Sequence, residues 1–190
     1  MAAAAPPRTL LVLGDSLSAG YGLEPGQGWV TLLEKRLLAQ GYEYRVVNAS
    51  ISGETTAGGL ERLPRALQLH KPSIVVVELG ANDGLRGLPV SVTQTNLTRI
   101  VTLARQTGAQ VLLLGMQMPP NYGPRYTAGF TRMFQDIARQ HRLAFAPFLL
   151  EGVALNSSLM QADGLHPNAR AQPRMLETVW PRLAPLLKKR

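Results

Sequence analysis

The sequence of 190 residues contains no cysteine. Disulfide bonds, thiolate-bound metal sites and a cysteine nucleophile are therefore excluded. No apolar run approaches the roughly 20 residues that a membrane-spanning helix needs, so we expect no stable membrane insertion. Residues 1–7 lack a charged segment followed by an apolar one, so as given they are no signal peptide, and we expect a disordered or extended tail there.

The composition indicates a globular chain with a basic surface. Hydrophobic residues make up 45% of the sequence and charged residues 17%, and the formal net charge is +8. This balance and length suit one domain, here 8–190, with a substantial core. A positive net charge can attract an anionic partner such as nucleic acid or the headgroups of anionic lipids. The arginines are scattered, however, and no basic block carries interleaved aromatics, so we expect no nucleic-acid partner, while attraction to lipid headgroups stays open.

Short apolar runs alternate with segments of helical spacing. The segment 73–79 contains the unbroken β-branched run 74–77, which is typical of a strand covered on both faces. In 90–105 the spacing of Val92, Leu97 and Ile100 predicts one apolar helix face. Strands are predicted at 9–13, 44–47, 73–79, 111–114 and 143–145. Helices are predicted at 31–40, 60–69 with a break or start at Pro64, 90–105, 126–140 and 175–187.

This alternation predicts the fold class. Strands separated by helices imply right-handed βαβ units and a parallel sheet. Five such strands make a single three-layer α/β/α domain of flavodoxin-like architecture. In such domains ligands bind outside the carboxyl ends of the strands. The segments that follow each predicted strand are therefore the places to look for chemically useful side chains.

The first such segment is Gly-Asp-Ser-Leu-Ser at 14–18, directly after the first predicted strand. A serine on a sharp turn at a strand end can be held exposed as a nucleophile. Asp and Ser in the same place commonly cap the next turn instead. Taken alone, Ser16 fits both interpretations.

Two further segments offer donors for a developing oxyanion. Gly53 follows the second predicted strand, and a glycine there lets a backbone N–H approach a substrate oxygen closely. Asn82 follows the third, and its amide can donate a hydrogen bond to an oxyanion. A plain turn at Gly53 and an Asx-turn at Asn82 are the structural alternatives.

The last segment is Asp163-Gly-Leu-His166-Pro. A carboxylate three residues before a histidine can fold back onto Nδ1–H in one turn and leave Nε2 free to accept a serine proton. The other two histidines, His70 and His141, lie near predicted helix ends, where an imidazole commonly contacts the last carbonyls. Each role of acyl-transfer chemistry thus has one candidate, and the chemistry requires neither a cofactor nor a metal.

With these motifs in order, the sequence resembles the GDSL, or SGNH, hydrolase family, closest to its bacterial thioesterase I, protease I and lysophospholipase group. The stretches that carry the resemblance are 13–21, 47–53, 77–89, 120–123 and 160–168. They span nearly the whole domain. Position 18 is serine, so Ser16 lies in no Gly-x-Ser-x-Gly elbow, which argues against the ordinary α/β-hydrolase fold.

The resemblance implies a role for each residue. Ser16 would attack the acyl carbon, with His166 as base and Asp163 fixing its tautomer. The N–H groups of Ser16 and Gly53 and the amide of Asn82 would form the oxyanion hole. A mobile loop that responds to acyl-chain binding would consist of Gly84, Leu85, Arg86, Gly87, Leu88 and Pro89.

The resemblance further implies a broad esterase, thioesterase and lysophospholipase, monomeric and periplasmic or secreted. Two alternatives stay open. One is a carbohydrate O-acetyl esterase on the same fold. The other is a flavodoxin-like module whose serine loop cradles a phosphate or a flavin; it gives no role to Asn82 or to the Asp163–His166 pair.

Overall fold

The computed structural model describes residues 6–189, and a five-stranded sheet forms its middle layer. The strands are β1 (Arg8–Gly14), β2 (Tyr44–Asn48), β3 (Ile74–Glu78), β4 (Gln110–Leu114) and β5 (Ala144–Ala146). All neighbouring strands pair in parallel, in the order β2-β1-β3-β4-β5. The predicted strands are confirmed to within about two residues at each end, the usual uncertainty of such boundaries.

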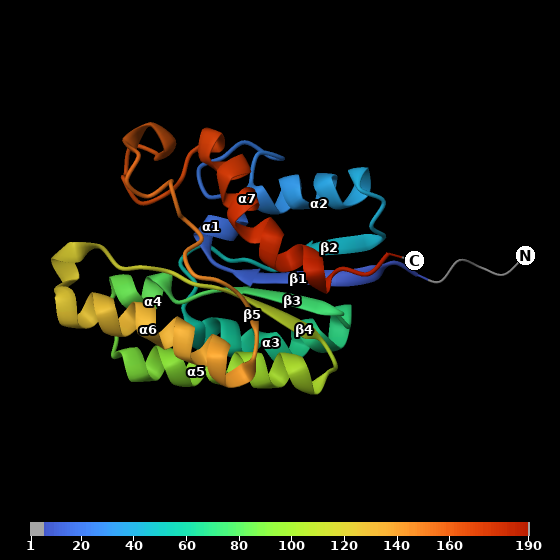
Figure 1. Ribbon diagram of the computed structural model, residues 1–190, viewed down its shortest axis with the longest axis horizontal. Helices are drawn as coiled ribbons and strands as arrows, with labels where there is room; N and C mark the ends of the chain where they lie inside the picture. Colours follow the sequence, from blue (N-terminus) through green and yellow to red (C-terminus); the bar gives the residue numbers. More distant parts are fainter. Residues whose placement is uncertain (1–5, 190) are drawn as a thin grey trace, which may run out of the picture.

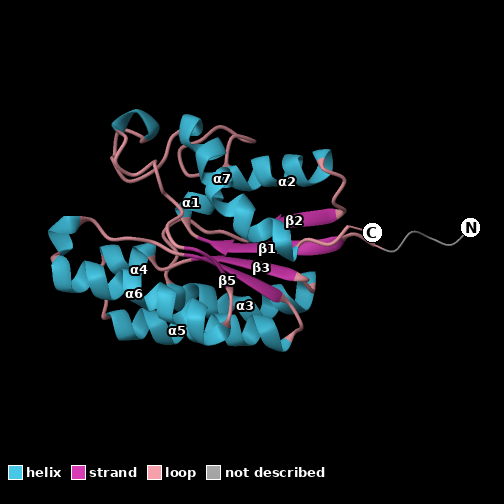
Figure 2. Ribbon diagram, in the orientation of Figure 1, coloured by secondary structure: helices cyan, strands magenta, loops and turns pink. Residues whose placement is uncertain are grey.

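Helices cover both faces of the sheet, as Figures 1 and 2 show. One face carries α2 (Trp29–Ala39) and α7 (Gln172–Leu183). The other carries α3 (Thr56–His70), α5 (Val90–Gln106) and α6 (Pro124–His141). Two short helices, α1 (Ser16–Ala19) and α4 (Ala81–Leu85), directly follow β1 and β3. The predicted three-layer α/β/α domain with a parallel sheet is therefore confirmed.

The two central strands are buried on both faces. Residues 10–13 of β1 and 74–77 of β3 have no solvent-exposed surface. Their leucine, isoleucine and valine side chains meet the helices of both outer layers, which is why these strands lack an apolar–polar alternation. The sheet order reverses between β1 and β3, and ligand sites in such sheets lie at the carboxyl ends of the strands at this point.

Helix α3 departs from its prediction. It begins at Thr56, four residues before the predicted start, and Pro64 lies inside it rather than at a break. The side chain of Thr55 caps its first turn by accepting the Gly58 N–H. Leu63 and Leu67 are buried in the core next to the proline, so tertiary packing compensates for the backbone hydrogen bond that Pro64 cannot donate.

The predicted apolar face of α5 is partly wrong. Val92 is 45% exposed, whereas Thr93 is completely buried. The Thr93 hydroxyl lies 3.5 Å from the buried carboxylate of Asp83, so a polar contact takes the inward position. The remaining members of that face, Leu97 and Ile100, are buried as predicted.

The predicted tail, 1–7, is described only at Pro6 and Pro7, which are exposed and precede β1; residues 1–5 and 190 lie outside the described residues. None of the helices in residues 6–189 is long and apolar enough to cross a membrane.

Candidate active site

Ser16 is the first residue of α1, directly after the carboxyl end of β1. Asp15 caps this one-turn helix, because its Oδ1 accepts the Leu17 N–H at 3.0 Å. Gly20 ends the helix with φ of 79°. The aspartate therefore caps the turn, and Ser16 stands at its first position, where backbone N–H groups have no intrahelical acceptor.

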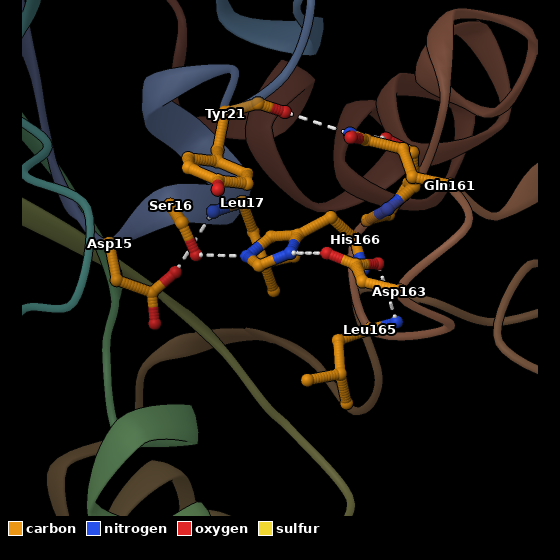
Figure 3. Close-up of polar contacts among 9 residues, drawn as sticks. Asp15, Ser16, Leu17, Tyr21, Gln161, Asp163, Leu165 and His166 are labelled. Atoms are coloured by element: carbon orange, nitrogen blue, oxygen red, sulfur yellow. Dashed lines mark hydrogen bonds and ion pairs between the residues drawn. The ribbon is translucent and has the colours of Figure 1, made fainter.

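The segment that follows η2 (Ser157–Leu159) brings His166 to Ser16, as Figure 3 shows. His166 Nε2 lies 2.9 Å from Ser16 Oγ. On the other side of the ring, His166 Nδ1 lies 2.6 Å from Asp163 Oδ2. The three side chains thus form one continuous hydrogen-bonded chain that joins residues 150 positions apart. This is the arrangement in which a base can deprotonate a serine while a carboxylate orients it.

Asp163 is held as an anion by its own short turn. Its Oδ1 accepts the N–H groups of Leu165 at 2.9 Å and His166 at 3.0 Å. The backbone bond from His166, its imidazole and the Leu165 N–H together lower the pKa of Asp163 from 3.8 to about 2. Asp163 therefore stays ionised at neutral pH, and it accepts rather than donates toward Nδ1.

Asn82 lies in α4 at the end of β3, beside the serine turn. Its Nδ2 donates to the Glu54 carbonyl at 2.9 Å and to Asp15 Oδ2 at 3.1 Å. The amide predicted from sequence as an oxyanion donor is therefore next to Ser16, but both of its hydrogens already have acceptors. A substrate oxygen would share a hydrogen with one of these acceptors or replace it.

Gly53 lies in an exposed turn after β2, with φ of 80°. The glycine suits this left-handed conformation, and a side chain there would meet no atom within 4 Å. Among the described residues Gly53 makes no hydrogen bond to Ser16, Asp163 or His166. It is joined to Asn82 through the next residue, Glu54, whose carbonyl accepts the Asn82 amide.

Two buried carboxyl groups lie beneath the nucleophile. Glu78, the last residue of β3, is 1% exposed, and so is Asp15. Glu78 Oε2 accepts the Ser18 hydroxyl at 2.6 Å and the Asp15 N–H at 3.3 Å. Glu78 was not predicted from the sequence, although a lone charged residue at the end of an apolar β-branched run was an available signal.

Burial dominates the ionisation of this pair. It raises the pKa of Asp15 to about 6 and that of Glu78 well above its usual 4.5. The nearby charge of Asp15 adds to the rise at Glu78, whereas the Leu17 N–H opposes the rise at Asp15, so Glu78 binds a proton more readily than Asp15. Asp15 is then the anion that accepts the Leu17 and Asn82 donors.

A third buried carboxylate, Asp83, was also missed. Its Oδ2 accepts the Thr56 N–H at 2.9 Å and its Oδ1 accepts the Thr56 hydroxyl at 2.5 Å. Thr56 begins α3, and an anion at a helix N-terminus is favourable. Asp83 therefore fixes the start of α3, and with it the turn that contains Gly53, against the helix that carries Asn82.

The segment 84–89 follows Asn82 along the chain and is called the rim below. Gly84 and Leu85 belong to α4, and the rest is loop. The hydroxyls of Tyr122 and Tyr126 each donate at 2.7 Å, to the carbonyls of Leu85 and Leu88. Arg86 Nη2 donates to the Gly53 carbonyl at 3.2 Å, so the rim is also tied to the turn after β2.

Comparison with known proteins gives concordant results. Residues 12–173 match the sequence model of the GDSL-like Lipase/Acylhydrolase family. The chain is 58% identical over 183 residues to esterase TesA of Pseudomonas aeruginosa, covering 96% of this chain and 91% of that protein. It is 42% identical over 184 residues to thioesterase 1/protease 1/lysophospholipase L1 of Escherichia coli, covering 97% and 87%.

The structure agrees with these sequence matches. A crystal structure of TesA superposes with a TM-score of 0.93 at 59% identity, covering 95% of this chain and all of that chain. The likeness therefore extends over the whole domain, including both segments that meet at Ser16 and His166. It favours the hydrolase over the alternative of a flavin- or phosphate-binding module.

Proposed function

The chain belongs to the GDSL-like lipase/acylhydrolase family and is a serine ester hydrolase, and we propose that Ser16, His166 and Asp163 are its catalytic triad. The observation that carries this proposal is the unbroken chain of contacts, 2.9 Å from Ser16 Oγ to His166 Nε2 and 2.6 Å from His166 Nδ1 to Asp163. No other histidine of the described residues contacts a serine hydroxyl.

The reaction begins when Ser16 Oγ attacks the acyl carbon while His166 Nε2 takes the hydroxyl proton. The carbonyl π electrons move to oxygen and produce a tetrahedral oxyanion. When this intermediate collapses, the bond to the leaving group breaks and His166 returns the proton to the departing alcohol or thiol. Water then attacks the acyl-serine by the same route, again with His166 as base, and releases the acid.

We assign the oxyanion hole to the Ser16 N–H, the Gly53 N–H and the Asn82 amide. Ser16 N–H lies at the start of α1, where the helix dipole favours negative charge. The Asn82 amide is held beside Ser16 by Asp15 and Glu54 before substrate arrives. Donors held in place before the reaction stabilise a developing oxyanion, and Asn82 does so by sharing or releasing one of its two present acceptors.

For substrates, we propose acyl esters, thioesters and lysophospholipids, with the rim 84–89 contacting the acyl chain. The activities named for the relatives, esterase and thioesterase 1/lysophospholipase L1, support this breadth. A panel of acetyl, octanoyl and palmitoyl esters tests it: comparable kcat/KM across chain lengths is expected, and activity confined to acetylated sugars would favour the O-acetyl esterase alternative. We also propose a monomer with a periplasmic or secreted location, to be checked by light scattering and cell fractionation.

The triad is tested by labelling with a fluorophosphonate, followed by peptide mapping. We expect the adduct on Ser16. Ser16→Ala should lose the adduct and about 10⁴-fold or more of kcat on a chromogenic acyl ester. Ser91→Ala, at an exposed serine near the start of α5, is the matched control and should keep both. An adduct elsewhere, or an active Ser16→Ala variant, would overturn the assignment.

A further inference from the structure

The segment that carries the base has little regular structure of its own. Between residues 160 and 168 the only β-bridge is that of Met160 with Pro167, and the Gln161 N–H also donates to the His166 carbonyl at 2.7 Å. Asp163 and Leu165 are exposed. Among the described residues, the backbone bonds hold the segment to itself but do not join it to the residues around Ser16, so a side-chain contact between the two segments can set the approach of His166 to Ser16.

The side chain of Gln161 makes that contact, as Figure 3 shows. Its Nε2 donates to the Tyr21 carbonyl at 2.8 Å and to the Pro167 carbonyl at 3.0 Å. Pro167 is the residue after His166. Tyr21 follows α1, and its own N–H donates to the Ser16 carbonyl at 3.1 Å. Both hydrogens of one amide thus join the backbone at the nucleophile to the backbone at the base.

The residues next to the Gln161 amide leave room for it. Gly22 has φ of 72°, and a Cβ there would lie 2.2 Å from Gln161 Oε1. Only a residue without a side chain leaves that space to the glutamine. Tyr21 places its ring over the imidazole, with 4.5 Å between the ring centroids of Tyr21 and His166 and 41° between their planes.

We propose that Gln161 is a positioning residue that sets the separation of Ser16 Oγ and His166 Nε2 by clamping the Tyr21 carbonyl to the Pro167 carbonyl. This role rests on the proposed function, because it acts through the Ser16–His166 pair. Gln161 does not touch the reacting atoms. Its effect is therefore on the rate of proton transfer and acylation and not on the binding of the acyl group.

Gln161→Glu is the sharpest perturbation, because it keeps the shape of the side chain and replaces the double donor with an oxygen. That oxygen would face two carbonyl oxygens and push the two segments apart. A misplacement of about 1 Å in a reacting pair can cost about 100-fold in rate. We expect kcat to fall about 10- to 100-fold with KM changed less than about twofold, and phosphonylation of Ser16 to slow in parallel.

Asn168→Asp is the matched control. Asn168 also donates both amide hydrogens within this segment, to the carbonyls of Ser158 at 2.9 Å and Met160 at 3.2 Å, but it makes no contact with Tyr21. Losing its donors should lower Tm while kcat stays within about threefold of the wild type. Equal kcat losses in the two variants at equal Tm would mean that Gln161 has only a structural role in the segment, and would refute the proposal.

Gly22→Ala provides an independent route to the same displacement, because the new Cβ would occupy the position of Gln161 Oε1. We expect Gly22→Ala to lower kcat, and we expect the same of Gln161→Ala, which removes both donors. The Gly22→Ala/Gln161→Ala double variant should be no slower than the slower of the two single variants, since both remove the same interaction. Additive losses of kcat in the double variant, or wild-type kcat in Gln161→Glu, would refute the positioning role of Gln161. If Ser16→Ala is inactive while Gln161→Glu is fully active, only the proposed role of Gln161 is wrong and the proposed triad stands.

Discussion

Replacing Asp15 by asparagine removes one buried charge beneath the nucleophile and leaves the shape of the side chain unchanged. Asp15 is 1% exposed, and its carboxylate accepts the Leu17 N–H at 3.0 Å and the Asn82 amide at 3.1 Å. The other ionisable groups that act on it are Glu78, His166 and Asp83. Burial outweighs all of them, which is why the pKa of Asp15 rises to about 6.

The consequence for stability follows from the direction of this change in pKa. In the unfolded chain the carboxyl of Asp15 ionises near 3.8, and in the folded chain near 6, so between these values the folded state binds more protons. The stability that Asp15 contributes is complete below about pH 4 and is lost as the pH rises through about 6. A rise in pKa from 3.8 to about 6 corresponds to about 3 kcal/mol. Because an asparagine side chain does not titrate, the Asp15→Asn variant should lack this part of the loss.

Urea unfolding followed by circular dichroism at several pH values between about 4 and 7 measures the effect. The free energy of unfolding should fall across this range by about 3 kcal/mol less in Asp15→Asn than in the wild type. Glu78→Gln is the matched control, because it removes the other buried carboxyl while Asp15 stays buried, so the fall near the pKa of Asp15 should persist. Parallel curves for Asp15→Asn and the wild type would refute the assignment of a buried, titrating Asp15.

Two further predictions concern the triad and the rim. Asp163→Asn should lower kcat by about 10⁴-fold, because the anion that holds the Nδ1–H tautomer of His166 is lost; a loss under about tenfold in steady-state kinetics, at unchanged Tm, would contradict this. Tyr126→Phe removes the hydroxyl that donates to the Leu88 carbonyl at 2.7 Å and should cost about 1 kcal/mol of local stability. KM should then rise for octanoyl esters and not for acetyl esters, and an equal change for both would mean that the rim does not meet the acyl chain.

The fold was predictable because its strongest signals are local. The β-branched run of β3 and the buried run of β1 need no distant partner to be recognised as covered strands. Parallel strands then bring the segments after them to one edge, so the sequence alone predicts that Ser16 and Asn82 are neighbours. Asn82 does donate to Asp15, the residue before Ser16. The roles of these residues in catalysis remain predictions until the variants are measured.

The short helices α1 and α4 were not predicted, and their length explains why. A helix of four or five residues forms too few intrahelical bonds to repay its nucleation and leaves no periodic pattern. Each exists because its strand ends in a fixed place and because contacts with another element hold it. For α4 those contacts include its own Asp83, which accepts the N–H and the hydroxyl of Thr56 in α3.

The supporting residues Glu78 and Gln161 were not predicted because their contacts join segments that are far apart in the sequence. Glu78 meets Ser18 across 60 positions of sequence, and Gln161 meets Tyr21 across 140. The place of Glu78 at the end of an apolar strand marks it as unusual but does not identify its partner, and Gln161 resembles any solvated glutamine, because the partners of both are defined only once the chain has folded. Reactive groups recur in recognisable local motifs, whereas the groups that set the distance between them are specified by the fold. A test of the triad alone would therefore leave the determinant of the 2.9 Å Ser16–His166 contact unidentified, and the Gln161 and Gly22 variants address that determinant directly.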